Sequence, residues 1–317
     1  MRYINEMHDG DNVTGIYLCK QKNTAQTKNG KDYENVTLAD KTGTISCKIW
    51  DPNSMGIGEF EPNDFVEVHG RISVFNGALQ MSIDRARKAN PETIDQSDYL
   101  PVSSRSIDSM YKELLSHISS VKTPYLRLLL DKFFVEDEDF IKAFKSHSAA
   151  KTIHHGFMGG LLQHTVAVCD LCAFYCKAYP KLDHDLLISA ALCHDIGKVR
   201  ELSEFPANDY TDAGQLLGHI VIGVEMIDEK ISQIRGFPAA KANQLKHLIL
   251  SHHGEFEFGS PKKPALIEAV ALNFADNTDA KLEAFTEILD NTVSTPSHGA
   301  GWLGFNKLFD SNIRPTV

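Results

Sequence analysis

Hydrophobic and polar residues alternate in short stretches over the first 90 residues, which predicts β-strands. Residues 43–50 show the pattern most clearly, because Ile45, Cys47 and Ile49 occupy every second position. Such alternation places apolar side chains on one face of a strand. Asn-Gly and Thr-Gly turn signals separate five stretches of this kind, over residues 13–20, 33–39, 43–50, 65–75 and 78–87. Five short strands in so few residues predict a small closed barrel.

Longer apolar runs replace this alternation after residue 105 and predict α-helices. Ser106 and Pro124 stand where a helix cap and a first helical turn favour these residue types. Helical runs follow over residues 165–179, 186–193, 245–251 and 266–285. The polar stretch between the two patterns contains two prolines and predicts a linker. We therefore expect a multidomain α and β fold, with a β-barrel over residues 1–90, a linker over 91–105 and an all-α domain over 106–317.

Composition and charge narrow the function classes. The chain has 317 residues and a net charge of −10, which argues against a surface that coats nucleic acid broadly. Residues 1–90 are nearly neutral, with 11 Lys and Arg against 12 Asp and Glu, so the barrel can still bind a polyanion locally. No apolar stretch has the length of a membrane span, and the first residues lack the apolar segment of a signal peptide. We expect a cytoplasmic protein with no membrane partner.

The six cysteines do not form the pattern of a disulfide framework. Cys169, Cys172 and Cys176 recur at helical intervals within an apolar run, which favours a place on a core face. The alternative is that Cys169 and Cys172 belong to a zinc or redox site. It is disfavoured because the second cysteine pair of a zinc knuckle is missing.

The segment around His194 and Asp195 carries the clearest chemical signal. This doublet ends the apolar run 186–193, and Gly197 follows as an expected helix stop. An imidazole nitrogen and a carboxylate oxygen together suit divalent Mn, Fe, Co, Ni or Zn, and the carboxylate can bridge two ions. Lys198 adds a positive charge where a phosphoryl oxygen would need it. A lone doublet also fits a helix-end cap or a surface pair.

Further histidines and a carboxylate occupy similar places in other predicted helices. His164 opens one apolar stretch, His219 starts an amphipathic segment, and His252 and His253 end a helical run before a glycine. Asp276 lies inside an apolar helical stretch, where an unpaired carboxylate would be costly to bury. Each residue alone fits a structural role. The ordered set is hard to explain in that way and favours a metal site.

The order His, His-Asp, His, His-His, Asp resembles the HD-domain metal-dependent phosphohydrolases. The resemblance spans residues 151–281 and implies an all-helical domain, with a metal core over residues 151–285, that uses divalent ions to cleave phosphate esters. The intermediate histidine and the His-His pair make the chain similar to the two-metal branch of that family. The implied metal ligands are His164, His194, Asp195, His219, His252, His253 and Asp276. We expect two divalent ions, with Mn favoured and Fe, Co, Ni, Mg or Zn as alternatives.

The resemblance also gives these residues expected roles. Asp195 would bridge the two ions, which together lower the pKa of a shared water so that the hydroxide attacks phosphorus. His164, His194 and Asp276 would complete one ion's shell, and His219, His252 and His253 the other. Lys198 would stabilise charge on the phosphoryl oxygens. Asp279, one turn after Asp276, would orient a ligand from behind.

His155 is a further catalytic candidate, because it lies shortly before the first expected ligand, His164. It could contact the scissile phosphate or a leaving oxygen. The alternative is that it belongs to a surface loop.

Residues 33–50 are similar to the OB-folds of nucleic-acid-binding proteins. In such folds the second and third strands present aromatic and basic side chains to single strands. The expected nucleic-acid-binding residues are Tyr33, Lys48, Trp50, Arg71 and Phe75, with Lys28 and Lys31 in the first hairpin. The alternative is that Trp50 and Phe75 fill the barrel core, and for Trp50 the core is favoured.

The barrel, the helical spacer and the motif His-His-x-x-x-Gly-Gly-Leu-x-x-His-Thr, over residues 154–165, together resemble the YhaM-type 3′-to-5′ exoribonucleases. This resemblance implies stepwise hydrolysis of single-stranded RNA, and to some extent single-stranded DNA, with Mn or a similar ion. One alternative is an HD phosphohydrolase of a small or cyclic nucleotide, whose barrel mediates partner or homo-oligomer contacts. Another is a non-catalytic nucleic-acid-binding adaptor, which is disfavoured because every ligand position is filled.

Overall fold

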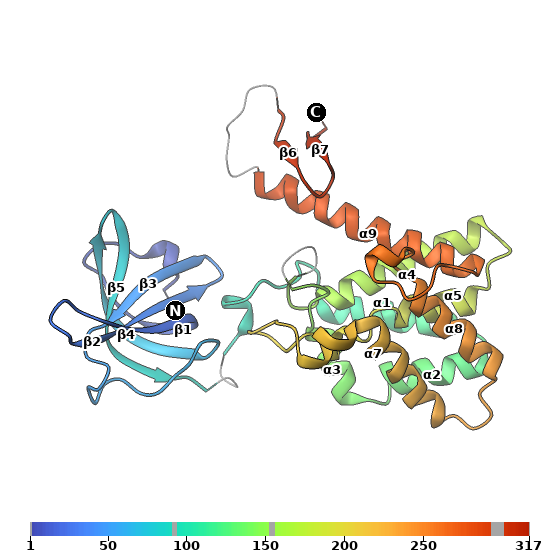
Figure 1. The fold of residues 1–317 in the computed structure, drawn as a ribbon, viewed down its shortest axis with the longest axis horizontal. Helices are drawn as coiled ribbons and strands as arrows, with labels where there is room; N and C mark the ends of the chain where they lie inside the picture. The colour runs from blue at the N-terminus through green and yellow to red at the C-terminus, as the bar shows by residue number, and fades with distance from the viewer. Residues whose placement is uncertain (1, 91–93, 152–155, 293–300, 317) are drawn as a thin grey trace. The chain divides into compact units, whose positions relative to one another are not determined.

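The computed structural model of the chain describes residues 2–90, 94–151, 156–292 and 301–316 (Figure 1). The chain divides into two compact units, Met1–Val102 and Ser103–Val317. The first unit is built from strands and the second mainly from helices, which confirms the expected fold class. His155, a catalytic candidate, lies outside the described residues. Within the described ranges, no helix is both long enough and apolar enough to cross a lipid bilayer.

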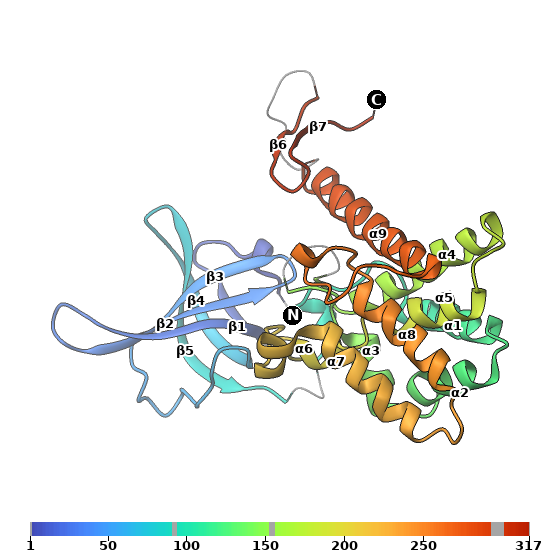
Figure 2. The same ribbon diagram turned by 45° about the vertical axis from the view of Figure 1, so that its right-hand side comes forward.

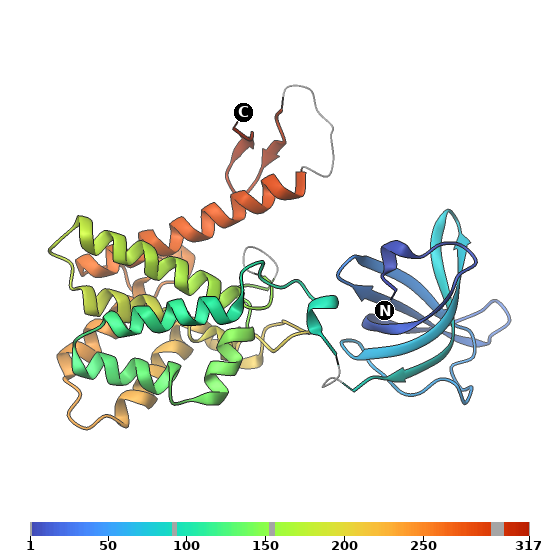
Figure 3. The same cartoon turned by 180° about the vertical axis from the view of Figure 1, so that it is seen from behind.

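The first unit is a closed barrel of five strands. The strands are β1 (Asn12–Gln26), β2 (Asp32–Asp40), β3 (Gly43–Ile49), β4 (Phe65–Phe75) and β5 (Ala78–Lys88), preceded by the short helix η1 (Ile4–Glu6). They close in the order β1-β2-β3-β5-β4, with β3 and β5 parallel and the other pairs antiparallel. Figure 3 shows these strands from behind, in blue to cyan. This arrangement confirms the expected OB-like barrel. β1 extends beyond residue 20 because its end pairs with the start of β2 in a long hairpin.

Alternation along the strands decides which side chains fill the barrel. Ile45, Cys47 and Ile49 of β3 are all at most 3% exposed and belong to one apolar cluster with Val36 and Met81. Neighbouring positions on the same strands point outward. The predicted two-residue period therefore produces this core directly.

Part of the segment expected as a linker packs on the barrel. The Tyr99 ring lies 5.1 Å from the Phe65 ring, and the Asp98 carboxylate accepts hydrogen bonds of 2.7 Å from Lys41 and Tyr3. The short helix η3 (Gln96–Asp98) carries these contacts. The boundary between the compact units falls after Val102 for this reason.

The second unit packs helices around one buried central helix, α5 (His184–Cys193) (Figure 2). The other helices are α1 (Ile107–Ser120), α2 (Pro124–Phe134), α3 (Glu138–Ser146), α4 (Gly160–Ala178), α6 (Lys198–Glu201), α7 (Asp212–Ser232), α8 (Ala239–Ser251), η4 (Phe256–Phe258) and α9 (Ile267–Thr292). Residues 186–193 of α5 are all buried, as the uninterrupted apolar run predicts. α5 packs against α1, α2, α4, α8 and α9. Its C-terminal end therefore lies deep inside the helical unit.

A short hairpin of β6 (Gly304–Asn306) and β7 (Ser311–Ile313) follows the helices. The Phe309 ring, in the turn between the two strands, lies 5.0 Å from the Phe285 ring on α9. This contact fixes the hairpin turn against the last helix.

α5 ends at Cys193, before Gly197, as expected, but Gly197 itself has no left-handed conformation. Its φ angle is −63°, and α6 begins at the next residue. A Cβ atom at this position would lie 2.0 Å from the His219 carbonyl oxygen, so only glycine lets α7 pass so close. The residue is needed for close packing against the backbone of α7 rather than for a turn.

Candidate metal centre and nucleic-acid face

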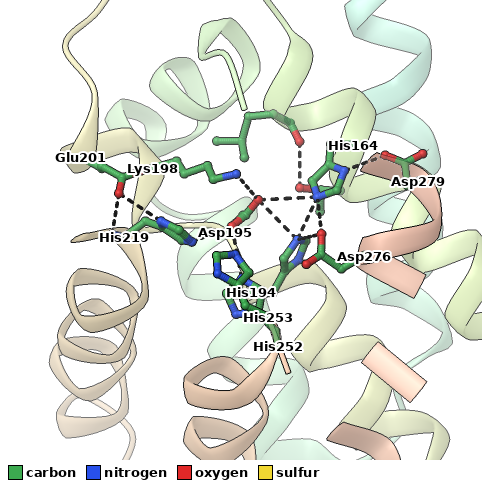
Figure 4. A network of polar contacts seen from close by, with 12 residues as sticks. His164, His194, Asp195, Lys198, Glu201, His219, His252, His253, Asp276 and Asp279 are labelled. Atoms are coloured by element: carbon green, nitrogen blue, oxygen red, sulfur yellow. Dashed lines mark hydrogen bonds and ion pairs between the residues drawn. The ribbon is translucent and has the colours of Figure 1, made fainter. Parts of the chain in front are cut away.

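The seven side chains expected to bind metal converge at the C-terminal end of α5 (Figure 4). His194 and Asp195 directly follow α5, and His252 and His253 follow α8 in the same way. The other three come from helix interiors: His164 from α4, His219 from α7 and Asp276 from α9. Residues spread over more than a hundred positions in the sequence thus meet in one cluster.

Two groups of ligand atoms lie next to each other in this cluster. The first group is His164, His194 and Asp276, and the second is His219, His252 and His253. Within each group, one nitrogen or oxygen of every side chain lies within 4.8 Å of the others, so each group could hold a divalent ion. In the first group, Nε2 of His164 lies 3.1 Å from Nε2 of His194 and 3.2 Å from Oδ1 of Asp276.

Asp195 stands between the two groups and offers one carboxylate oxygen to each. Oδ2 lies 3.4 Å from Nε2 of His194 and 3.5 Å from Nε2 of His164. Oδ1 lies 3.4 Å from Nε2 of His219 and 3.7 Å from Nε2 of His252. The geometry suits a carboxylate that bridges two cations.

Three polar atoms at the second group have no hydrogen-bond partner. Among the described residues, Oδ1 of Asp195, Nε2 of His219 and Nε2 of His252 are buried without a hydrogen-bond partner. Such atoms are rare, because each costs roughly 1–3 kcal/mol when left unsatisfied. One divalent cation between them would satisfy all three. The side chains present therefore fit a metal site.

In each of the five histidines of the two groups, Nδ1 contacts a carbonyl or carboxylate oxygen of the protein. His194, His252 and His253 donate from Nδ1 to the carbonyl oxygens of Ala191, Ile249 and Phe258, at 2.7, 2.7 and 2.8 Å. Nδ1 of His164 lies 2.6 Å from Oδ2 of Asp279, and Nδ1 of His219 lies 3.0 Å from Oε1 of Glu201. A proton on Nδ1 leaves the Nε2 lone pair available to a metal. The expected supporting role of Asp279 agrees with this contact.

Glu201 is a functional candidate that the sequence reading did not assign. Its side chain is buried, and Oε1 accepts a 2.9 Å hydrogen bond from the His219 backbone nitrogen as well as contacting the ring. Gly218 has a φ angle of +73°, which breaks α7 just before His219 and frees that backbone N–H. The glycine before His219 is the signal in the sequence that could have indicated the kink.

Electrostatics in the cluster also favour a cation. Burial opposes the charge on Asp195, but Lys198 and His194 hold the pKa of its carboxyl well below the usual range. Burial and the neighbouring His253 keep the pKa of His252 well below its ordinary value, so this ring is neutral and able to bind metal. Burial opposes a proton on His164, yet hydrogen bonds to Asp276 and Asp279 raise its pKa to about 10. A cation between these groups would displace that proton.

A cavity of about 470 Å³ opens onto both ligand groups. His164 and Asp276 of the first group and His253 of the second line it, together with Lys198. Nζ of Lys198 lies 2.7 Å from Oδ2 of Asp195. Burial opposes the ammonium charge, but the Asp195 carboxylate raises the pKa of Lys198. A phosphate group in the cavity would meet the ligand groups and this ammonium together.

Three of the expected nucleic-acid-binding residues form a cluster on the outer face of the barrel. The rings of Tyr33 and Trp50 lie 5.2 Å apart, and Nζ of Lys48 lies 4.8 Å from the centre of the Tyr33 ring. Trp50 is 49% exposed, so the favoured core interpretation was wrong. Ile49 points inward at this end of β3, and the two-residue period therefore sends Trp50 outward.

Strand register extends this cluster into a polar row. Asn35 on β2 pairs with Lys48 on β3, Lys48 pairs with Ser82 on β5, and Ser82 pairs with Arg71 on β4. Lys48 also donates a hydrogen bond to Asn35. The row places an Arg and a Lys on one outer face of the barrel, with the two aromatic rings at its β2–β3 end.

The remaining candidates lie at the ends of the strands. Phe75 is 61% exposed, so it does not fill the core, but it lies about 13 Å along β4 from Arg71, beside the turn into β5. Lys28 is exposed in the β1–β2 hairpin, and Nζ of Lys31 lies 3.7 Å from Oδ1 of Asp51, next to Trp50. Lys31 therefore belongs near the aromatic cluster, whereas Phe75 does not.

Cys169 and Cys172 belong to the core of the helical unit. Cys169 and Cys172 are buried in α4, and burial raises the pKa of both thiols. Thiolates are the form that binds zinc or reacts with disulfides. Their environment therefore argues against the zinc or redox alternative.

The chain is similar to one family model and to several solved structures. Residues 161–281 match the family model of the HD domain. The chain is also similar to the second OB-fold domain of replication protein A from Methanococcus maripaludis, with 21% identity over 30% of this chain and 98% of that domain, at a TM-score of 0.23. A replication protein A heterotrimer bound to single-stranded DNA is similar at 20% identity over 29% of this chain and 65% of that chain, with a TM-score of 0.21. Likenesses of this size carry no functional inference. The chain combines an OB-like five-stranded barrel with a helical HD domain, and the HD domain indicates a metal-dependent phosphohydrolase.

Proposed function

We propose that this chain hydrolyses phosphodiester bonds of single-stranded nucleic acid, RNA foremost, from the 3′ end, at a centre that binds two divalent ions. The observation that carries the proposal is the position of Asp195. Each of its oxygens faces a separate ligand group. Its Oδ1, together with Nε2 of His219 and Nε2 of His252, is buried without a hydrogen-bond partner. Such a site suits two ions that share one carboxylate.

Ions bound there would act as Lewis acids toward a phosphoryl oxygen and lower the pKa of an attacking water. Side chains of the protein would stabilise the charge on the phosphate and hold the candidate ligands in position. Lys198 would stabilise negative charge on the phosphate, because its ammonium lines the cavity beside Asp195. Asp279 and Glu201 hold His164 and His219 so that both Nε2 atoms stay turned toward the centre. Five imidazoles and two carboxylates without thiolate suit Mn, Fe, Co, Ni or Zn, and the choice of Mn among them rests on the resemblance to the YhaM-type exoribonucleases.

The barrel surface supports a single-stranded polymer as the substrate class. Bases stack on exposed aromatic rings, and basic groups contact the backbone of a single strand. Tyr33, Trp50, Lys48 and Arg71 offer this combination on one face of a nearly neutral unit. The 3′-to-5′ direction and the preference for RNA rest on the resemblance to the YhaM-type exoribonucleases.

A small or cyclic nucleotide is the second candidate substrate. The cavity volume of about 470 Å³ favours it, because sites for molecules of nucleotide size have similar volumes. The two functions differ in what happens to a polymer. An exonuclease shortens it stepwise, whereas a nucleotide phosphohydrolase leaves it intact.

A labelled-strand assay tests the proposal. The full chain is incubated with Mn²⁺ and single-stranded RNA labelled at its 5′ end, and the products are separated by length. A ladder that shortens from the 3′ end supports the proposal. An intact strand together with rapid turnover of free or cyclic nucleotides supports the second candidate instead. Asp195→Ala, with RNA binding measured in parallel, should abolish cleavage and leave binding largely unchanged.

A further inference from the structure

One face of α9 continues from the ligand cluster into the cavity. Asn273, Asp276, Asn277, Ala280 and Lys281 line it, at the spacing of neighbours on one side of a helix. Asn273 donates a 2.7 Å hydrogen bond to the His252 carbonyl oxygen. Among the described residues, the side chains of Asn277 and Lys281 form no hydrogen bond or ion pair. They offer an amide and an ammonium beyond the metal-binding side chains.

An aromatic residue lines the same cavity from another segment. Phe258, at the end of η4, lines the cavity and is 61% exposed. Its carbonyl oxygen accepts the 2.8 Å hydrogen bond from Nδ1 of His253, so the backbone of Phe258 is fixed directly to a candidate ligand. Ala280 and Leu308 add apolar surface to the cavity. The cavity therefore has an apolar aromatic element close to its phosphate-binding end.

We infer that this part of the cavity is the subsite for the 3′-terminal nucleotide of the strand. The inference rests on the proposed function and names how the same site takes its substrate. Phe258 stacks on the terminal base, and Asn277 and Lys281 contact the sugar and phosphate of that nucleotide. Lys281 lies five residues after Asp276, about 7.5 Å along the helix axis, and both residues line the cavity.

The physical chemistry favours this ligand over others. A cavity of about 470 Å³ lies within the range of sites that hold ligands of nucleotide size. Stacking on a ring accepts every base, because every base has a π-face. Such a subsite predicts trimming by one nucleotide at a time with little dependence on sequence.

The test uses two RNA oligonucleotides that differ only in the 3′-terminal residue, which is either a normal nucleotide or an abasic one. The wild-type chain should trim the normal end with a kcat/KM about 5- to 150-fold higher than the abasic end. Phe258→Ala and Phe258→Leu should lose most of this difference, because both remove the ring. Phe258→Tyr, which keeps the ring, should retain it.

Phe256→Ala is the matched control, because Phe256 is 62% exposed in the same short helix and is not among the residues that line the cavity. This variant should behave as the wild type. Lys281→Ala should raise KM for both oligonucleotides alike, since it contacts the backbone and not the base. Bound Mn is measured for every variant, and it should be unchanged.

The outcomes distinguish a failure of the proposed nuclease function from a failure of the subsite. If the wild-type chain trims neither oligonucleotide, the proposed function itself fails. If the wild-type chain trims both ends equally well, or Phe258→Ala keeps the full preference for a terminal base, the subsite is overturned while the nuclease proposal stands. A loss of preference in Phe256→Ala equal to that in Phe258→Ala would also contradict the subsite.

Discussion

Oε1 of Glu201 lies 3.0 Å from Nδ1 of His219 and 2.9 Å from the backbone nitrogen of the same residue. One carboxylate thus holds both the ring and the backbone of His219 at the kink in α7. The second ligand group contains this histidine, so its geometry depends on a residue that binds no ion itself.

Glu201→Ala should therefore weaken metal binding at the second group. Removal of a supporting carboxylate typically costs about 10- to 100-fold in metal affinity. Titration of the apo-protein with Mn²⁺ should show one weakened ion and one nearly unchanged ion. Glu229→Ala is the control, because Glu229 is an exposed partner of Arg200. Equal loss of both ions, or no loss at all, would contradict the separate roles of the two groups.

Asp195→Asn and Asp276→Asn should differ in metal stoichiometry. Asp195 faces both groups, so its substitution should impair both ions, whereas Asp276 belongs to the first group alone. Metal content after equilibration with Mn²⁺ and desalting gives the count. Loss of the same single ion in both variants would contradict the proposal that Asp195 bridges the two ions.

Lys198→Ala should lower kcat by about 10²- to 10³-fold, as expected when a group that stabilises transition-state charge is removed. Metal content and KM should change far less, because Lys198 is not a ligand. Lys198→Arg restores the charge with a different shape and should recover part of the rate. Unchanged kcat in Lys198→Ala would exclude this role.

Trp50→Ala should weaken binding of the full chain to a single-stranded oligonucleotide by about 5- to 150-fold. The side chain is 49% exposed and lies outside the barrel core, so stability should change little. Val74→Ala serves as the control, since Val74 is an exposed apolar residue that pairs with Leu79 beside the turn between β4 and β5. Fluorescence anisotropy of a labelled strand measures the affinity, and equal binding by both variants would argue against the barrel face.

Asp185 predicts a pH dependence of stability. Its Oδ2 accepts hydrogen bonds of 2.9 Å from the Lys122 backbone N–H, 2.6 Å from the Thr123 backbone N–H and 2.8 Å from the Thr123 hydroxyl, and so ties α5 to the start of α2. Burial opposes the charge, but hydrogen bonds from His184 and Thr123 lower the pKa of the Asp185 carboxyl below its ordinary value of 3.8.

Because the folded-state pKa is depressed, this stabilisation is present above pH 3.8 and is lost as the pH falls through the lower folded-state value. Asp185→Asn should lower the free energy of unfolding by roughly 1–3 kcal/mol at neutral pH. The difference from wild type should shrink toward pH 3. Urea unfolding followed by far-UV circular dichroism measures it, and a difference that grows with acid would have the wrong sign.

Local patterns in the sequence were sufficient for most of the fold. The two-residue period of residues 43–50 gives both the strand β3 and its buried face, and the run 186–193 gives the buried helix α5. Trp50 was misread because its aromatic character favoured the core, whereas the period of the strand decides its direction. Local spacing was the stronger evidence at this position.

Residues whose roles depend on long-range contacts could not be predicted from local sequence patterns. Gly197 looks like a helix stop, and its close approach to the His219 carbonyl becomes visible only when α7 is in place. Glu201 and His219 are separated by 18 positions, and no periodic pattern connects them. Phe258 likewise acquires its proposed role only because η4 is fixed to His253. Such residues depend on tertiary packing rather than on local propensity.

Anomalous X-ray scattering from crystals grown with Mn²⁺ tests the central claim most directly. The account predicts two peaks, one on each side of Asp195, with His164, His194 and Asp276 around one and His219, His252 and His253 around the other. A single peak that Asp195 does not contact, or ligand side chains turned away from each other around no peak, would contradict it.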